Sequence, residues 1–210
     1  MQELIYGCMG LGGSWSDEPH GTEHVDQAAA AVGQLMAEGK VRQLGVSNMS
    51  GAQIEALQDR LETPVVANQL EMSLLKRAWL ESQVLVNHAE HLDYSFPHGT
   101  LEYCVRNSIT LQAYGSLARG LYTGAEPESP ASADAATAQL VARLAGEYGS
   151  TGEAVLLGWL MKHPAGIAPV IGTVNPERIR ACADAARVAG TMTRADWSKL
   201  WVTARGSNIP

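Results

Sequence analysis

The chain has 210 residues, of which 46% are hydrophobic and 18% are charged, so it can bury a sizeable core and is not expected to be disordered or a coiled coil. Its formal net charge is −7, from 22 acidic and 15 basic residues, which argues against binding to nucleic acid or to an anionic membrane surface. A small molecule or another protein is the partner that this composition favours.

No run approaches the roughly 20 apolar residues that cross a bilayer. Residues 1–6 have no basic segment and are typical of a strand rather than of a signal peptide. The three cysteines, Cys8, Cys104 and Cys182, are odd in number and far apart, which argues against a disulfide framework or a clustered zinc site. We therefore expect a reducing, cytoplasmic location.

Short apolar runs alternate with helix-length amphipathic segments along the chain. The predicted strands are residues 4–9, 43–46, 64–70, 109–114 and 167–171. Repeated strand and helix units of this kind predict a parallel sheet with right-handed crossovers, buried on both faces. The sequence therefore predicts an α/β fold of about five parallel βα units in a single domain over residues 1–210.

A first helix is predicted over about residues 22–38, where apolar side chains recur at helical spacing. Gly33 lies in the middle of it, at a cost of roughly 1 kcal/mol against alanine. We interpret this glycine as a seam between two helical pieces.

The later helix starts carry capping signals, and two stretches are predicted to be loops. The capping pairs are Ser50 with Gln53, Ser150 with Glu153, Asn175 with Pro176, and Thr193 with Asp196. Residues 125–134 are rich in Pro, Ser, Glu and Ala, and residues 93–100 form a second irregular stretch. Neither stretch is long enough to separate two domains.

Four segments carry a pattern that composition does not reveal, namely residues 39–48, 67–71, 113–120 and 169–179. Together, and in this order, they resemble the aldo-keto reductases, and residues 6–13 resemble that family's first strand and loop. The resemblance covers nearly the whole chain. It implies a TIM barrel as the ancestral fold and NADP(H) as the cofactor.

Three polar residues, Ser47, Asn48 and Gln69, fall at or just beyond the ends of predicted strands, where parallel α/β folds place ligand contacts. The resemblance implies that they hydrogen-bond the nicotinamide carboxamide and that Tyr114 stacks on the nicotinamide ring. Taken singly, the three polar side chains could merely satisfy strand ends, and Tyr114 could be part of the core.

The opposite end of the dinucleotide is assigned by the same resemblance. Asn175 and Pro176 open a helix whose N–H groups and dipole suit a phosphate. Arg178 resembles the arginine that pairs with the 2′-phosphate of NADP(H), although it could instead pair with Glu177 or solvent. Cys182 stands where many members have a polar residue near the adenine. The candidate cofactor-binding residues are Ser47, Asn48, Gln69, Tyr114, Gly115, Ser116, Leu117, Gly172, Thr173, Asn175 and Arg178.

The resemblance breaks where the catalytic residues of the family belong. Members reduce carbonyls with a tyrosine, a lysine, an aspartate and a histidine from the second to fourth strand regions. Here residues 27–32, similar to the first helix of the family, run directly into residues 33–40, similar to the end of its fourth helix. We therefore predict an internally truncated member with a fused helix at about 22–38, a partial barrel, and no catalytic tetrad.

No other catalytic or metal-binding set emerges from the sequence. The lysines Lys40, Lys76, Lys162 and Lys199 lie at no recognisable family spacing from a tyrosine. His20 with His24, and His88 with His91, have spacings that could bring two rings together, yet a third ligand is missing. We predict no metal site.

The cut barrel is expected to keep its ancestral neighbours. The strands near residues 43, 64, 109 and 167 would then be followed by the strand near residue 4, which leaves two exposed edges. The sheet would either close into a smaller barrel, with strand 4–9 beside strand 43–46, or associate across its edges. We favour a homodimer, because a five-stranded barrel is too narrow for bulky inward residues.

Three functions remain open at this point. The first is a family member without carbonyl reductase activity that binds NADP(H) at most weakly. The second is an active NADPH-dependent aldehyde or ketone reductase with a substitute proton donor such as Tyr6, His98 or water. The third is a non-catalytic barrel fragment that self-assembles.

Overall fold

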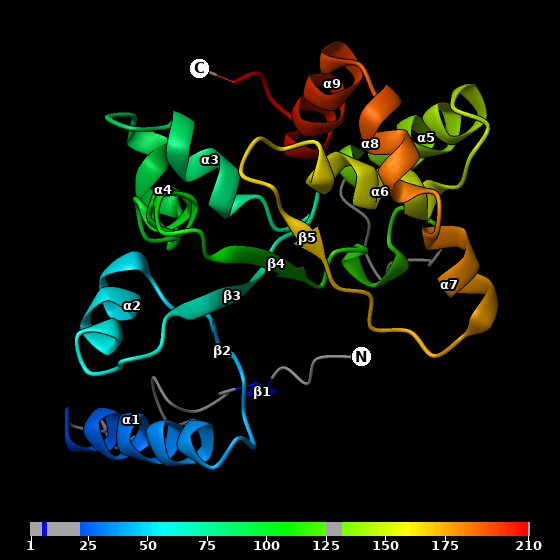
Figure 1. The fold of residues 1–210 in the computed structure, drawn as a ribbon. Helices are drawn as coiled ribbons and strands as arrows, with labels where there is room; N and C mark the ends of the chain where they lie inside the picture. Colours follow the sequence, from blue (N-terminus) through cyan, green and yellow to red (C-terminus); the bar gives the residue numbers. More distant parts are fainter. Residues whose placement is uncertain (1–5, 8–21, 125–131, 210) are drawn as a thin grey trace. The chain divides into compact units, whose positions relative to one another are not determined.

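The computed structural model describes residues 6–7, 22–124 and 132–209, and these form two compact units (Figure 1). The first unit comprises Met1–Leu70 and Pro97–Leu111, and the second comprises Glu71–Phe96 and Gln112–Pro210. In chain order the elements are β1 (Tyr6–Gly7), α1 (Thr22–Ala37), β2 (Leu44–Ser47), α2 (Gly51–Gln58), β3 (Val65–Glu71), α3 (Ala78–Val84), the 3₁₀ turn η1 (Ala89–Asp93), α4 (Thr100–Arg106), β4 (Thr110–Tyr114), the 3₁₀ turn η2 (Ala118–Gly120), α5 (Ser132–Glu147), α6 (Gly152–Met161), β5 (Ala168–Pro169), α7 (Pro176–Cys182), α8 (Ala185–Thr191) and α9 (Arg194–Arg205).

The α/β class with a parallel sheet is confirmed. The strand order is β1-β2-β3-β4-β5. Strand β1 runs parallel to β2, with Tyr6 opposite Leu44, and β2 runs parallel to β3, with a register irregularity between Leu44 and Gly45. In the second unit β4 runs parallel to β5, with Gln112 opposite Ala168. Predicted strand residues 4, 5, 8 and 9 lie outside the described residues.

Of the two positions expected for the first strand, the place after the strand near residue 167 is wrong, whereas the alternative beside strand 43–46 is confirmed. Strand β1 pairs with β2. A parallel pair needs a crossover of about a dozen residues, and consecutive strands joined in this way usually lie side by side. Helix α1 lies in the described part of the connection between β1 and β2, and the two strands are neighbours as this rule predicts.

Helix α1 runs from Thr22 to Ala37 without interruption and includes Gly33. Ala29 is buried at 7% exposure, whereas Gly33 is exposed, and a Cβ built on it would have nothing within 4 Å. The glycine is therefore tolerated in the helix without any close approach that requires it.

The capping predictions are confirmed except at one helix. Ser50 and Gln53 form the predicted capping box of α2, and the Thr193 side chain accepts from the Asp196 N–H of α9. At α6 the expected Ser150–Glu153 box is wrong, because Thr151 is the N-cap and accepts from Ala154 N at 3.1 Å.

The hydroxyl groups of two adjacent residues explain the shift at α6. Thr151 Oγ1 also donates to Ala181 O at 2.5 Å, which ties the start of α6 to α7. Ser150 Oγ instead donates to Asp184 Oδ2 at 2.6 Å. Either hydroxyl is a good cap, and the partners in α7 and beyond it decide which one is used.

The predicted loops agree with the structure in part. Residues 94–99 are irregular, and α4 begins at Thr100. Of the predicted loop 125–134, residues 125–131 lie outside the described residues, and α5 already begins at Ser132. Within the described ranges, no helix has both the length and the apolar character needed to cross a bilayer.

The core of the second unit surrounds α6, which is apolar on all sides and buried from Ala154 to Leu160. The Trp159 ring stacks on Trp197 with centroids 5.4 Å apart and packs edge-on against Trp79 at 5.8 Å. Each indole N–H of the stacked pair donates to the other residue's carbonyl, at 3.0 and 2.9 Å. These contacts join α3, α6 and α9 and support the cavity described below.

Two glycines of the first unit make a matched test of this fold. A Cβ on Gly51, at the start of α2, would lie 2.8 Å from Tyr103 Cβ of α4. We expect Gly51→Ala to lower the free energy of unfolding by about 1–3 kcal/mol through overpacking. Gly33→Ala should raise it by up to about 1 kcal/mol, because alanine favours the helix and meets no neighbour. Urea unfolding followed by far-UV circular dichroism measures both, and equal effects would contradict the packing argument.

Candidate functional site

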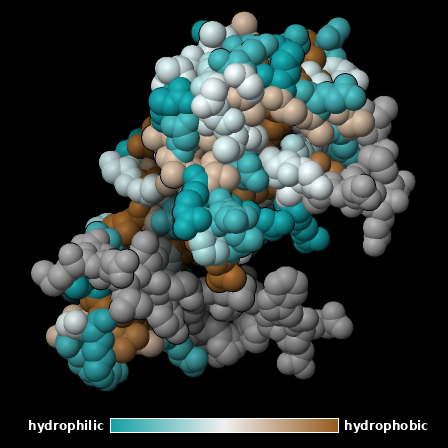
Figure 2. All heavy atoms as spheres, turned by 90° about the vertical axis from the view of Figure 1, so that its right-hand side faces the viewer, coloured by the Kyte–Doolittle hydropathy of each residue, from teal (hydrophilic) through white to brown (hydrophobic). Residues whose placement is uncertain are grey.

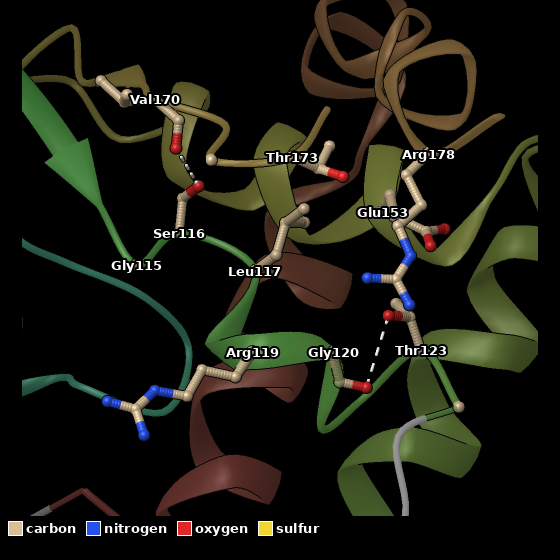
Figure 3. Close-up of a pocket in the computed structure, with 12 residues that line it drawn as sticks. Gly115, Ser116, Leu117, Arg119, Gly120, Thr123, Glu153, Val170, Thr173 and Arg178 are labelled. Carbon is tan, nitrogen blue, oxygen red and sulfur yellow. Dashed lines mark hydrogen bonds between the residues drawn. The ribbon is translucent and has the colours of Figure 1, made fainter. Parts of the chain in front are cut away.

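A cavity of about 410 Å³ lies within the second unit, and six predicted cofactor residues line it (Figure 3). They are Gly115, Ser116, Leu117, Gly172, Thr173 and Arg178. The volume is in the range of small-molecule pockets, roughly 300–1,000 Å³. The structure therefore brings together residues that are far apart in the sequence around a space of useful size.

One wall is the loop that follows β4. Gly115 has φ +64°, which suits a residue without a Cβ, and the chain then turns through Ala118 and Arg119 at φ +50° and +56°. Non-glycine residues in this left-handed region are strained and persist only where the surroundings hold them. Backbone bonds from Ala118 N to Gly115 O and from Gly120 N to Leu117 O, both 2.9 Å, hold the loop tightly folded.

The other wall is the segment from β5 to α7. Ser116 Oγ donates to Val170 O at 2.9 Å, and Val170 N donates to Ala113 O at 2.8 Å, so the two walls are joined at their base. Ser116 is buried at 3% exposure. Its hydroxyl proton is committed to this contact, so the side chain positions the walls rather than donating to a ligand.

The start of α7 corrects one expectation. Asn175 Oδ1 accepts from Glu177 N at 2.9 Å and from Arg178 N at 3.4 Å, so these N–H groups are occupied by the cap and not presented to a phosphate. Of the groups expected to contact a phosphate at this helix, the guanidinium of Arg178 is the one that lines the cavity. Figure 3 shows this side chain extending from α7 into the cavity towards Thr123. Arg178 is exposed, and no ion pair is formed to it within the described part of the chain.

Two charged residues that the sequence reasoning missed also line the cavity, Glu153 and Arg119. Glu153 belongs to the first turn of α6 and is half-buried. Figure 3 shows Arg119 pointing away from Arg178. The sequence offered no signal for Glu153 beyond its expected role in the cap.

The nicotinamide-end candidates of the first unit lie together at the ends of β2 and β3. Ser47 Oγ donates to Gln69 O at 3.0 Å, and Asn48 N donates to the same oxygen at 2.9 Å. The hydroxyl of Ser47 thus satisfies a backbone carbonyl at the end of β3, which is the alternative, structural role considered for it above. Tyr114 belongs to the second unit, and its carbonyl accepts from Met72 N at 3.2 Å.

Asn68 is a buried polar residue that the motif did not single out. Its side chain is completely buried, and Nδ2 donates to Met49 O at 2.8 Å. Alternation along β3 places it on the opposite face from Gln69. Its Oδ1 has no hydrogen-bond partner. This hydrogen bond from Asn68 holds the loop after β2 in place. In the sequence, only the alternation along β3 could have indicated that Asn68 is buried.

The described tyrosines with a shifted pKa are all moved away from neutrality. Burial raises the pKa of Tyr122, and its bond to Asp134 at 3.0 Å raises it further. Burial and the bond to Asp196 at 2.8 Å raise the pKa of Tyr148. Burial likewise raises the pKa of Tyr103 and of Tyr94. A tyrosine in such surroundings is a poor proton donor near pH 7.

None of these four shifts involves a lysine. Lys162 Nζ donates to Ala189 O at 3.3 Å, and Lys40 pairs with Glu38 at 2.6 Å. The side chain of Tyr6 lies outside the described residues, and His98 is exposed in the first unit. Among the described residues, no group of three or more His, Cys, Asp or Glu side chains is placed to hold a metal ion. His20 lies outside the described residues.

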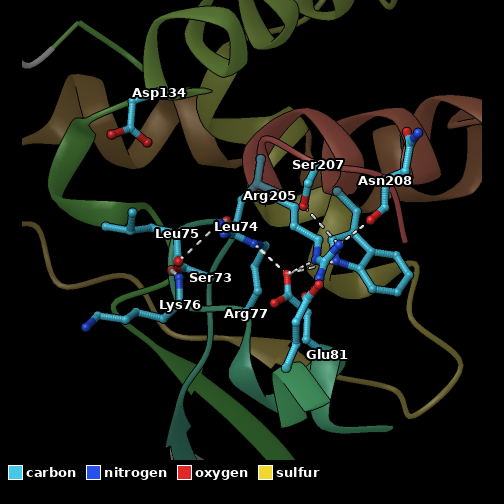
Figure 4. Close-up of polar contacts among 12 residues, drawn as sticks. Ser73, Leu74, Leu75, Lys76, Arg77, Glu81, Asp134, Arg205, Ser207 and Asn208 are labelled. Atoms are coloured by element: carbon cyan, nitrogen blue, oxygen red, sulfur yellow. Dashed lines mark hydrogen bonds and ion pairs between the residues drawn. The ribbon is translucent and has the colours of Figure 1, made fainter. Parts of the chain in front are cut away.

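A buried carboxylate supports the loop after β3 (Figure 4). Glu81 is 1% exposed and accepts from Arg77 Nε at 2.9 Å and from Trp201 Nε1 at 3.2 Å. Arg77 Nη1 in turn donates to Leu74 O at 2.7 Å. Arg205 Nε lies 3.9 Å from the same carboxylate. This network joins α3, the loop after β3 and α9.

The network decides the charge state of Glu81. Burial by itself raises the pKa of this carboxyl, but hydrogen bonds from Tyr94 and Arg77, the charge of Arg77 and the Trp201 indole together lower the pKa below its ordinary value. Glu81 is therefore charged at neutral pH although it is buried. These partners together compensate the cost of burying its charge.

Comparisons with known proteins give a consistent picture. Residues 14–200 match the sequence profile of the Aldo/keto reductase family. A 6-dehydroglucose reductase of Agrobacterium fabrum is 33% identical over 204 residues, covering 90% of this chain and 60% of that protein. A 6-dehydroglucose reductase of Novosphingobium aromaticivorans is 32% identical over 187 residues, covering 89% and 54%. The chain thus spans less than two thirds of the length of these relatives.

Solved structures agree on the fold. A thermostable aldo-keto reductase, Tm1743, crystallised with the inhibitor epalrestat, superposes with a TM-score of 0.65 at 20% identity, covering 95% of this chain and 59% of that one. An aldose reductase from Giardia lamblia gives a TM-score of 0.60 at 18% identity, covering 92% and 53%. The parallel α/β fold matches these barrels, and a partial barrel is consistent with the match.

The buried network makes a pH-dependent contribution to stability. We expect Glu81→Gln to destabilise the second unit by about 3 kcal/mol at pH 7, because it removes the paired carboxylate of the largely buried Arg77, whereas Arg205 keeps its pair with Glu90. The pKa of Glu81 is lowered by folding, so its contribution is present above the ordinary glutamate pKa of about 4.3 and is lost as the pH falls below it. The difference between wild type and variant should therefore shrink towards pH 3.

Urea unfolding followed by tryptophan fluorescence measures this effect, since Trp79, Trp159, Trp197 and Trp201 lie in the second unit. Glu147→Gln is the matched control, because Glu147 forms an exposed pair with Arg143. It should cost less than about 0.5 kcal/mol. Equal losses in the two variants would rule out a special role of the buried carboxylate.

Proposed function

Because the chain belongs to the aldo/keto reductase family, we propose that it is an internally truncated member that has lost the Asp/Tyr/Lys/His tetrad and binds NADP(H) weakly without efficient carbonyl reduction. The single observation that carries this proposal is the cavity of the second unit, where Gly115, Gly172 and Arg178 meet. The family generally uses NADP(H).

The donors around the cavity fit the phosphate-bearing end of a dinucleotide. A guanidinium recognises a phosphate through two parallel hydrogen bonds, and Arg178 reaches into the cavity. A Cβ built on Gly172 would meet nothing within 4 Å, so the backbone there leaves room for a ligand. Cys182 is buried among Leu157 and Ala185 and offers the adenine no polar contact, which supports weak rather than tight binding.

The truncation is supported by the connection between the first two strands. The connection between β1 and β2 contains one helix, α1, among its described residues, and these two strands pair directly. A complete barrel has eight such strands in about 250 residues or more. Within the described ranges of this chain, the sheet contains five strands. Removal of the intervening units would also remove the elements that carry the tetrad in the family.

The loss of the proton donor is supported by the tyrosine environments. When bound, NADPH supplies a hydride, and reduction of a carbonyl also needs a proton. Tyr94, Tyr122 and Tyr148 bond to carboxylates, and the pKa of each is raised. These residues hold their protons too tightly at neutral pH to replace a lysine-activated tyrosine.

A cytoplasmic location is part of the same proposal. Cys104 and Cys182 are both buried and unpaired. Reduced thiols are the rule in that compartment.

Titration with NADPH, followed by its fluorescence, tests the proposal. We expect saturable binding with a dissociation constant of about 0.1–1 mM, where each tenfold corresponds to about 1.4 kcal/mol. Arg178→Gln should weaken binding about tenfold by removing the charge-assisted contacts. Arg180→Gln, on the same helix but outside the cavity, is the matched control and should bind like wild type.

The absence of turnover is tested with the same cofactor. NADPH consumption with a panel of reactive aldehydes, and with 6-dehydroglucose because it appears in the names of two relatives, should not exceed the rate in buffer. A saturable rate would instead establish an active reductase. No binding up to millimolar NADPH would remove the cofactor proposal.

We also propose that two chains associate through the edges of the sheet. Strands β1 and β5 stand at the two ends of the strand order, and unpaired edges with apolar side chains invite association. Beside β5, Val170 and Ile171 are 37% and 36% exposed. Figure 2 shows that apolar side chains reach the surface of the described part of the chain.

Light scattering at micromolar concentration tests the association. Wild type is expected to have the mass of two chains, and Ile171→Lys the mass of one, because a buried lysine would oppose edge pairing. Val84→Lys, at an exposed apolar site on α3 away from the sheet edge, should remain a dimer. A wild-type mass of one chain rules this proposal out.

A further inference from the structure

A carboxylate shares the cavity with Arg178. Glu153 comes from the first turn of α6 and Arg178 from α7, and both line the same space. Figure 3 shows the two side chains next to one another on the wall opposite Leu117. No ion pair joins them, so each charge is available to a third group.

The helix itself does not account for Glu153. An acidic residue in a first turn gains about 0.3–1 kcal/mol from the helix dipole, which any exposed position there would supply. Thr151 already caps α6 through Ala154 N. Glu153 lines the cavity together with Arg178 of α7, so its carboxylate lies on the side of α6 that faces this space.

The two charges belong to different modes of dinucleotide recognition. A carboxylate that accepts hydrogen bonds from the 2′-hydroxyl of the adenosine ribose favours NAD(H), whereas an arginine that pairs with the 2′-phosphate favours NADP(H). A carboxylate also repels a phosphate directly through the low-dielectric wall of a pocket. This cavity contains one residue of each kind.

We infer that Glu153 is a specificity-determining residue that opposes the 2′-phosphate and accepts a hydrogen bond from the free ribose hydroxyl, so that the site binds NAD(H) about as well as NADP(H). The inference rests on the proposed dinucleotide site. It also accounts for weak NADP(H) binding, because Arg178 attracts the phosphate and Glu153 repels it.

Parallel titrations with NADPH and NADH, followed by nucleotide fluorescence, test the inference. Wild type should bind the two within about threefold of one another. Glu153→Gln should bind NADPH about tenfold more tightly and NADH several-fold more weakly, since it removes the repulsion and weakens the acceptor. Arg178→Gln should shift the preference the opposite way, towards NADH.

Glu177→Gln is the control for long-range charge. It makes the same chemical change one residue before Arg178, but Glu177 does not line the cavity. We expect it to leave the ratio of the two affinities within about twofold of wild type, because exposed charges are screened. Far-UV circular dichroism confirms folding of each variant, and Glu153→Ala replaces Glu153→Gln if that variant does not fold.

The possible outcomes separate the two proposals. If both nucleotides bind and Glu153→Gln leaves the affinity ratio unchanged, the role of Glu153 is overturned while the dinucleotide site stands. If Glu153→Gln and Glu177→Gln change the ratio equally, the effect is one of net charge and the specific role is also overturned. If neither nucleotide binds to wild type at millimolar concentration, both proposals fail together.

Discussion

Parallel strands can be neighbours only if a crossover brings the chain back to the same edge of the sheet, and the described part of the connection from β1 to β2 contains one helix, α1. That constraint accounts for the strand order, since β1 lies beside β2 and not at the far end after β5. It also bears on the proposed truncation, because the single helix in the described part of this connection is one of the observations that support it.

The cavity of the second unit is held by contacts within that unit. The bond from Ser116 to Val170 joins the loop after β4 to the segment after β5. Left-handed residues Ala118 and Arg119 keep the loop tightly turned around the cavity. Behind it, the stacked indoles of Trp159 and Trp197 hold α6 against α9. The walls of the cavity are thus joined to each other, and the helices near them are packed together, by residues of the second unit alone.

The second unit has two groups of charged residues that differ in burial, the network around Glu81 and the pair of cavity residues Glu153 and Arg178. Glu81 is buried and satisfied by several donors, so it serves the structure and keeps its charge. Glu153 and Arg178 are more accessible and are not paired with each other, so their charges remain available to a ligand. Burial with complete hydrogen bonding stabilises a fold, whereas accessible unpaired charge around a cavity confers recognition.

Much of the fold and part of the site followed from the amino-acid sequence. Apolar runs located the five strands to within a few residues, because alternation and helical spacing are local properties. The caps at Ser50 and Thr193 were also predicted, since each needs only residues within one turn. The motif order identified the family, and it named six of the residues that line the cavity.

Other features depended on contacts between distant residues, and for this reason local patterns did not reveal them. Thr151 rather than Ser150 caps α6 because their hydroxyls find partners about 30 residues further along the chain. The N–H groups at the start of α7 are occupied because Asn175 turns back on them. Glu153 joins Arg178 only once α6 and α7 pack together. Chain connectivity and packing determine which distant side chains line the same cavity, and both are properties of the tertiary structure rather than of local sequence.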